Sequence, residues 1–371
     1  MISPKVFQPR SSIVVSFEAH TLQRPLDFVG EIVIEEQDEN EYVFEIAKNE
    51  DSSKIAAALS NRSVVFYDGN MTPLGKFDGH TGTVNDVIFA GHDVILSACE
   101  DRKVRGWDIR SKNQVFEVTH DDEVMNMSLG CGGTMLATAS GMGAHFIDMR
   151  TSKRIGFYSD NHTDIVTQVC FNNGGAEVAT GSEDGLVCIY DTTQAKAEDS
   201  VQAVINADCA IRKIGFFAPG GEGMYVLTGS ETLSLWHKNS AQCINPQHQD
   251  ARHLLSTSNV NVDYLVDCHY NPTSEKLLLT AADWNGVTSI SEVTNSSVLP
   301  LASLTSGHRS MVRSSMFISQ DVVLTGGEDS RICAWDLSAS PPPATTRTSR
   351  PTNGRKSGGR EVNGRERSSL Y

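Results

Sequence analysis

The sequence contains no long hydrophobic stretch. None of its apolar runs approaches the roughly 18 residues that a membrane-spanning helix needs. The first residues, MISPKVFQPRSSIVVSF, also lack the apolar core and the cleavage site of a signal peptide. We therefore expect a soluble intracellular protein, in the cytoplasm, the nucleus or both, that has no membrane partner.

The cysteines and histidines lack the spacings of a metal site. None of the eight cysteines forms a Cys-x-x-Cys pair, and several lie inside apolar runs such as Val187-Cys188-Ile189. His248, His253 and His269 have no cysteine or carboxylate partner at a ligand spacing. The cysteines are typical of small core residues in a reducing compartment. We expect no metal and no other cofactor.

Positive charge is scarce outside the C-terminal end. The chain has 31 basic and 46 acidic side chains, and residues 338–371 hold seven of the basic and two of the acidic ones. The remainder therefore carries 24 basic against 44 acidic residues, a net charge of −20. Such an acidic body makes nucleic acid an unexpected partner. Residues 338–371, rich in Pro, Ser, Gly and Arg, are expected to form a disordered basic tail.

A repeated pattern of short strands organises the rest of the chain. Apolar runs alternate with tight turns, and each repeat can be marked at the end of its third run. The seven marks are Tyr67-Asp68, Trp107-Asp108, Ile147-Asp148, Tyr190-Asp191, Trp236-His237, Ser291-Glu292 and Trp335-Asp336. They lie 40 to 55 residues apart, so seven repeats are expected in one domain over residues 29–337, after an extension over residues 1–28.

The most complete repeat, between Gly307-His308 and Trp335-Asp336, resembles the WD40 family. This resemblance implies an all-β, seven-bladed propeller with four strands per blade. It also implies that a strand from the N-terminal region completes the last blade, because no strand-like sequence follows Asp336. We expect this closing strand at Glu31–Glu36, with Ser12–Phe17 as the alternative.

The family resemblance also implies buried networks of histidine, hydroxyl, carboxylate and aromatic side chains. The networks expected are His80, Ser97, Asp101 and Trp107; His162, Thr180, Asp184 and Tyr190; and His308, Thr325, Asp329 and Trp335. The recurrence of this set in several blades, and the absence of a Gly-x-Ser-x-Gly nucleophile motif, argue against catalysis. We expect no enzyme and no catalytic residues; a perturbed carboxylate pair in the central channel would reopen the question.

Two consecutive repeats end in Asp-x-Arg, at Asp108 and Arg110 and at Asp148 and Arg150. Planar guanidinium groups on one rim of neighbouring blades could pair with carboxylates of a partner. The two boxes resemble those of substrate receptors for the cullin-4 ubiquitin ligase. The alternative is an ordinary salt bridge between aspartate and arginine within each turn.

One interval is longer than the others and contains an insertion between Pro246 and Asp263. A long loop on a rigid scaffold is a candidate contact site. The expected contact residues are Asp250, Arg252, Asp263 and Tyr264. The alternative is a self-folded loop in which Asp250 pairs with Arg252.

These features favour a non-enzymatic scaffold that binds other proteins and has no small-molecule substrate. One alternative is the substrate receptor of a cullin-4 type ligase. A second is a chaperone-like role, in which the acidic body binds a basic client.

Overall fold

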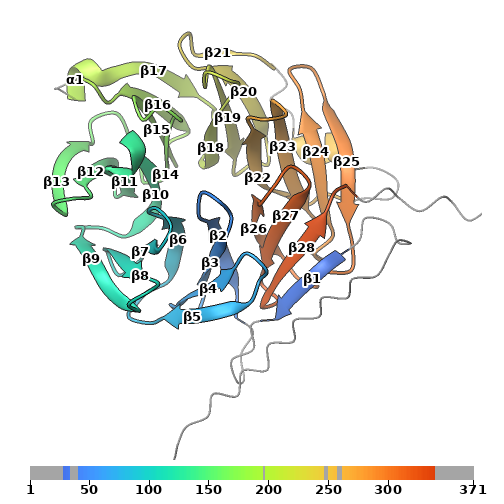
Figure 1. The fold of residues 1–371 in the computed structure, drawn as a ribbon. Helices are drawn as coiled ribbons and strands as arrows, with labels where there is room; N and C mark the ends of the chain where they lie inside the picture. Colours follow the sequence, from blue (N-terminus) through green and yellow to red (C-terminus); the bar gives the residue numbers. More distant parts are fainter. Residues whose placement is uncertain (1–27, 34–40, 195–196, 246–249, 257–260, 339–371) are drawn as a thin grey trace, which may run out of the picture.

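The fold is a closed ring of seven four-stranded antiparallel sheets, seen along its axis in Figure 1. The computed structural model describes residues 28–33, 41–194, 197–245, 250–256 and 261–338. These sheets confirm the expected seven-bladed propeller. Apart from Ser338, the expected tail over residues 338–371 lies outside the described residues, as does the extension over residues 1–28 apart from Phe28.

Each blade runs from an inner strand to an outer strand. Blades 1 to 3 comprise β2 (Val43–Lys48), β3 (Lys54–Leu59), β4 (Val64–Asp68) and β5 (Pro73–Phe77); β6 (Val84–Phe89), β7 (Val94–Cys99), β8 (Lys103–Asp108) and β9 (Asn113–Thr119); and β10 (Val124–Gly130), β11 (Met135–Ser140), β12 (Gly143–Asp148) and β13 (Lys153–Tyr158). Blades 4 and 5 comprise β14 (Val166–Phe171), β15 (Glu177–Ser182), β16 (Leu186–Asp191) and β17 (Val201–Asn206); and β18 (Ile211–Phe217), β19 (Gly223–Thr228), β20 (Leu233–His237) and β21 (Gln242–Cys243).

Blades 6 and 7 complete the ring. They comprise β22 (Tyr264–Asn271), β23 (Lys276–Ala282), β24 (Thr288–Val293) and β25 (Val298–Leu304); and β26 (Val312–Phe317), β27 (Val322–Gly327), β28 (Arg331–Asp336) and β1 (Phe28–Val33). In the described part of the chain, three short helical segments interrupt the pattern, namely the 3₁₀ turn η1 (Cys131–Gly133), α1 (Ala197–Ser200) and α2 (Ala251–Leu255).

Strand β1 closes the ring from the other end of the sequence. It pairs antiparallel with β28, with Glu31 opposite Cys333. The expected closing strand is thereby confirmed, although it begins at Phe28 rather than at Glu31. Residues 34–36 of that expected strand and its alternative, Ser12–Phe17, lie outside the described residues.

The connections between strands alternate between two faces of the ring. We call the face that carries the turns between second and third strands, together with the connections between blades, the top face. The opposite face, which carries the remaining turns, is the bottom face. In each blade the regular alternation of antiparallel strands fixes which residues reach each face.

The core lies between neighbouring blades. In the contact between blades 2 and 3, Leu96 and Val104 pack with Leu136 and Ile147. Because each sheet buries both faces, strands such as β3, with sequence KIAAAL, are apolar at almost every position. Each blade therefore depends on its neighbours for burial, as expected of a repeat protein.

All eight cysteines lie in the described part of the chain, and none forms a disulfide. Cys99, Cys188, Cys268 and Cys333 are buried in the core, as their apolar surroundings predicted, whereas Cys131 is exposed at η1. No helix in the described part of the chain combines the length and apolar character that crossing a membrane requires.

Candidate functional site

Blades 2 and 7 each hold a complete buried hydrogen-bond network beneath the top face. In blade 2 the Trp107 indole nitrogen donates to Ser97 Oγ at 2.9 Å, and Ser97 Oγ lies 2.7 Å from His80 Nε2. His80 Nδ1 lies 3.0 Å from the Asp101 carboxylate, which also accepts from the Thr81 amide. This arrangement fits a neutral imidazole that donates from Nδ1 and accepts at Nε2.

The same geometry recurs in blade 7, where His308 Nδ1 lies 3.0 Å from Asp329 and Nε2 lies 2.8 Å from Thr325 Oγ1. The Trp335 indole nitrogen donates to the same Thr325 hydroxyl at 2.8 Å. The network ties the top turn to the inner part of the sheet. All of its polar atoms have partners inside the blade, so it leaves no nucleophile for a substrate.

Blade 4 has a variant of this network. His162 Nε2 lies 2.7 Å from Thr180 Oγ1, and Nδ1 lies 3.2 Å from Asp184. Tyr190 replaces the tryptophan and accepts a hydrogen bond from Asn161 at 3.3 Å. The aromatic position is therefore tied to the turn before the blade through Asn161, a contact that blades 2 and 7 lack.

Burial and hydrogen bonding act in opposite directions on these groups. Burial lowers the pKa of His80 despite the attraction of Asp101. Burial alone would raise the pKa of Asp101, but hydrogen bonds from His80 and the Thr81 amide hold it below its ordinary value. The pair is thus a neutral histidine held by a carboxylate.

His80, Cys99 and Asp101 form the one group in the described part of the chain that is spaced to hold a metal ion. Burial raises the pKa of the Cys99 thiol to about 12, which disfavours the thiolate that a metal requires. Both nitrogens of His80 are already used in hydrogen bonds. The group fits the blade network better than a metal site.

The two Asp-x-Arg boxes lie on the bottom face, at the turns that follow β8 and β12. Asp108 and Asp148 each accept a hydrogen bond from the backbone amide of their own arginine, both at 2.8 Å. The side chains of Arg110 and Arg150 are 79% and 78% exposed. Arg110 pairs with Asp93 at 2.6 Å, and Arg150 approaches Asp148 at 3.5 Å. The aspartates thus shape the turns, while both guanidinium groups face solvent.

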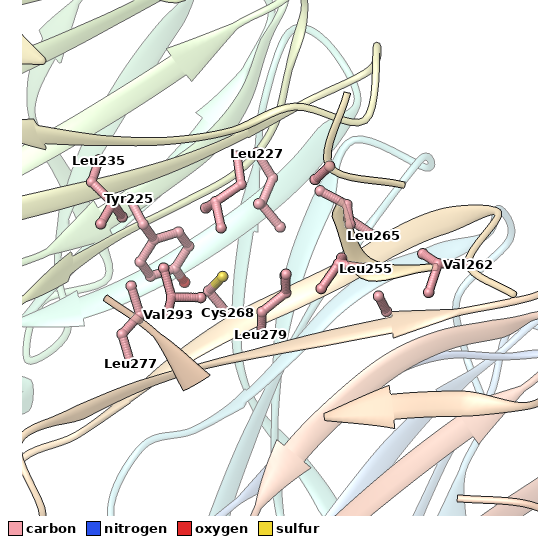
Figure 2. Packing of buried hydrophobic residues seen from close by; sticks show 13 residues of the cluster. Tyr225, Leu227, Leu235, Leu255, Val262, Leu265, Cys268, Leu277, Leu279 and Val293 are labelled. Carbon is pink, nitrogen blue, oxygen red and sulfur yellow. The ribbon is translucent and has the colours of Figure 1, made fainter. Parts of the chain in front are cut away.

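The described part of the insertion loop, residues 250–256 and 261–263, packs onto blades 5 and 6. Asp250 caps the start of α2 and forms a bidentate ion pair with Arg252, whose closest contact is 2.6 Å. Figure 2 shows Leu255 and Val262 of this loop packed against Leu265 and neighbouring core residues. The described part of the loop is therefore anchored by a hydrophobic contact, and its Asp250–Arg252 pair is internal.

Two of the expected loop contacts serve the fold. Tyr264 is only 3% exposed, and its hydroxyl accepts a hydrogen bond from the Val312 amide at 2.7 Å, which joins blades 6 and 7. This burial corrects its assignment as a contact residue. Asp263 accepts hydrogen bonds from Asn261 and from the Trp284 amide. Of the four residues, Arg252 is the most accessible to a partner, with a side chain that is 43% exposed.

The centre of the ring contains a polar layer that the sequence did not reveal. One residue per blade follows a register shift in the inner strand, namely Glu45, Asp86, Asn126, Gln168, Lys213, Asp267 and Ser314. Lys213 reaches from blade 5 to Glu45 of blade 1 at 3.0 Å, with Asp267 at 3.8 Å. Asp86 accepts from the Met127 amide of the next blade at 2.6 Å.

This layer contains the perturbed carboxylate that would reopen the question of catalysis. Burial and nearby Glu45 raise the pKa of Asp86 to about 7. However, Asp86 is buried and bonded to the Met127 amide and the Asn126 side chain, and Glu45 is bonded to Lys213. Both carboxylates join one blade to another through these hydrogen bonds. Their contacts therefore indicate a structural role.

The top face of blades 2 to 4 carries a cluster of exposed carboxylates. We call it the acidic rim, and it comprises Glu100, Asp121, Asp122, Glu123, Asp160, Asp164 and Glu183. Within the described residues, the one ion pair to this rim joins Arg154 to Asp121 at 3.9 Å. Met142 and Ile165 are exposed beside these carboxylates. The run Asp121-Asp122-Glu123 was a signal in the sequence, but only the fold brings the other four acidic residues next to it.

Comparisons with known proteins agree with this architecture. A family model described as "Nucleolar protein 10-like, N-terminal domain" matches residues 66–266. The chain is 33% identical over 320 residues to WD repeat-containing protein GTS1 of Arabidopsis thaliana, covering 80% of this chain and 81% of that protein. It is 25% identical over 196 residues to the U3 small nucleolar RNA-associated protein 15 homolog of Gallus gallus, covering 41% and 38% of the two chains.

Several stretches of sequence also resemble WD repeat-containing protein 89, among them residues 162–169, 249–252 and 307–314. The comparisons confirm this likeness. The chain is 28% identical over 327 residues to the WD repeat-containing protein 89 homolog of Dictyostelium discoideum, covering 86% of this chain and 88% of that protein. The similarity therefore extends over nearly the whole ring.

Proposed function

The chain belongs to the WD-repeat β-propeller family, whose members generally act as protein-interaction scaffolds, and we propose that it binds a basic segment of a partner protein along its acidic rim. The observation that carries this proposal is the cluster of seven exposed carboxylates on the top face of three consecutive blades. This is the basic-client role that the charge of the body suggests.

The surroundings of the rim support a protein segment as its ligand. Arginine and lysine side chains would pair with the carboxylates, while apolar side chains of the same segment would contact Met142 and Ile165. Because exposed charges are strongly screened, the association should weaken as ionic strength rises. A rigid ring presents these groups without a cost of ordering, which favours affinity.

A charge-removal variant tests this function. Asp121→Asn, Asp122→Asn and Glu123→Gln are combined, and partners of the wild type and the variant are compared by proximity labelling and mass spectrometry. Basic partners should be lost from the variant, and their binding to the purified wild type should fall in high salt. Removing three bottom-face carboxylates, with Glu50→Gln, Asp51→Asn and Glu275→Gln, provides a control. An unchanged set of partners would overturn the proposal.

A second candidate function is that of a substrate receptor for a cullin-4 type ligase. The observation that favours it is the exposure of Arg110 and Arg150 on the same face of neighbouring blades. Replacing both arginines with alanine should abolish co-purification of the ligase adaptor without changing the melting temperature. Retained co-purification would exclude this role.

The nucleus, and the nucleolus in particular, is the compartment that we propose. The matching family model and the chicken relative both carry nucleolar names. A fluorescent fusion of the full chain, imaged with a nucleolar marker, tests this localisation. A purely cytoplasmic signal would contradict it.

A further inference from the structure

A pocket of about 510 Å³ opens on the bottom face where blades 1, 6 and 7 meet. Its walls come from the ends of three inner strands, which contribute Lys48, His269 and Phe317, and from the turns that follow β22 and β26. The site lies on the opposite face from the acidic rim. The function proposed above does not use it.

Lys48 is the unusual residue of this pocket. Its ammonium group donates to Ser52 Oγ at 2.8 Å and to the Ile318 carbonyl oxygen at 3.3 Å. Throughout the described segments, no carboxylate lies within salt-bridge distance of it. By contrast, the partly buried Lys54 and Lys213 each pair with an acidic side chain.

An unneutralised, partly buried cation stands out in a body with a net charge of −20. Burial lowers the pKa of Lys48, as expected where desolvation is not offset by a counter-ion. A bound carboxylate would replace the lost hydration and supply the missing negative charge. The site is thus electrostatically complementary to an acidic ligand, while most of the surface is not.

One wall of the pocket is apolar, while Asn271, Thr273, Ser319 and Gln320 add polar groups to its lining. Met316 and Leu278 are buried in this wall, and the half-buried Ile318 also lines the pocket. His269 is fixed by a hydrogen bond to Ser315 at 3.2 Å and by an edge-on contact with Phe317. The pocket therefore offers one cation beside a preorganised apolar wall, the pattern that recognises an aliphatic or aromatic side chain next to a carboxylate.

We propose that this pocket binds a short acidic peptide segment of a partner protein. A glutamate or aspartate of the segment pairs with Lys48, and a neighbouring apolar side chain packs against Met316 and Ile318. The pocket opens to solvent at the seam of three blades, so an extended chain can cross it. With a basic segment on the top face and an acidic one on the bottom face, the ring would join two partners of opposite charge.

Selection from a phage-displayed random peptide library, performed on the full chain, tests the proposal. The selected peptides should contain an acidic residue next to a large apolar one. In fluorescence polarisation, Lys48→Glu should weaken the binding of such a peptide at least tenfold. Lys112→Glu, on the bottom face of blade 2, serves as the matched control and should bind as the wild type does.

Two further variants distinguish binding in this pocket from misfolding and from binding at the acidic rim. Lys48→Met keeps the aliphatic stem and removes the charge, so it should also weaken binding even if Lys48→Glu proves poorly folded. The triple variant of the acidic rim should bind the peptide normally, so the two sites succeed or fail independently. Selected peptides that are basic, or that bind Lys48→Met as tightly as the wild type, would overturn the proposal.

Discussion

Blades 2 and 3 are neighbours with the same four-stranded topology, but their interiors differ. In blade 2, His80 has a partner at both nitrogens, whereas in blade 3 His120 contacts Thr138 at 2.7 Å and its Nδ1 has no partner. The turn of blade 3 is shorter, with Ser140 paired directly to Gly143, so that no residue occupies the position of Asp101. The blade forms without the network because packing against its neighbours determines its backbone.

In blade 3, aromatic rings pack where blade 2 has its hydrogen-bond network. His145 packs beside His120 with ring centroids 4.9 Å apart and stacks on Phe157 at 4.2 Å. Burial and repulsion from His145 lower the pKa of His120 to about 4, and burial and repulsion from Arg154 lower the pKa of His145 to about 4. Blade 3 therefore replaces hydrogen bonds with ring packing, and the variants below exploit this difference.

The largest difference in stability between variants of blades 2 and 3 should appear at the aromatic position of the network. Trp107 is buried, stacks on Phe77 at 5.2 Å and donates to Ser97. Trp107→Ala should lower the free energy of unfolding by about 3–5 kcal/mol, since it leaves a large cavity. The equivalent Ile147 tolerates Ile147→Val with a loss of about 0.5–1.5 kcal/mol. Urea unfolding measures both, and equal losses would contradict the comparison.

The turn carboxylate should have the next largest effect. Asp101→Ala leaves His80 Nδ1 and the Thr81 amide without their acceptor, much as His120 Nδ1 lacks one in blade 3, and should cost about 1–3 kcal/mol. Because Asp101 raises the pKa of His80 against the effect of burial, the variant should also lower that pKa in an NMR titration. Asp121→Ala, at an exposed site, is the control and should leave stability within about 0.5 kcal/mol.

The inner strands of blades 2 and 3 should differ in how their contribution to stability depends on pH. Asp86 of blade 2 and Asn126 of blade 3 occupy equivalent positions, and each accepts from a backbone amide of the following blade. Because the folded-state pKa of Asp86 is raised to about 7 from 3.8, the folded protein retains a proton that the unfolded chain releases. The stability present below pH 3.8 is therefore lost as pH rises toward and through 7.

Asp86→Asn removes this titration while keeping an acceptor, as Asn126 does. The variant should gain on the order of 1 kcal/mol relative to the wild type between about pH 5 and pH 8. Thermal and urea unfolding at a series of pH values measure the difference. Parallel pH profiles for the two proteins would show that Asp86 does not titrate in this range.

The sequence predicted features that depend on local spacing. The Trp-Asp marks and the turn aspartates located the blades, because the same turn and strand-end residues recur in successive blades. The sequence could not predict the contact between Lys213 and Glu45, since it joins residues 168 apart across the ring. It also misplaced Tyr264, because an aromatic residue at the end of an unusual loop looks the same whether it faces solvent or begins a buried strand. The isolated charge of Lys48 became visible only once its neighbours were known.

The smallest effect on stability is expected at the two Asp-x-Arg boxes, where blades 2 and 3 are most alike. Both arginines are largely exposed, and surface ion pairs contribute little. Arg110→Ala and Arg150→Ala together should change the free energy of unfolding by less than about 0.5 kcal/mol. If the double variant melts normally yet loses the ligase adaptor, the arginines serve a partner rather than the fold. If it melts normally and keeps every partner, the boxes are turn residues.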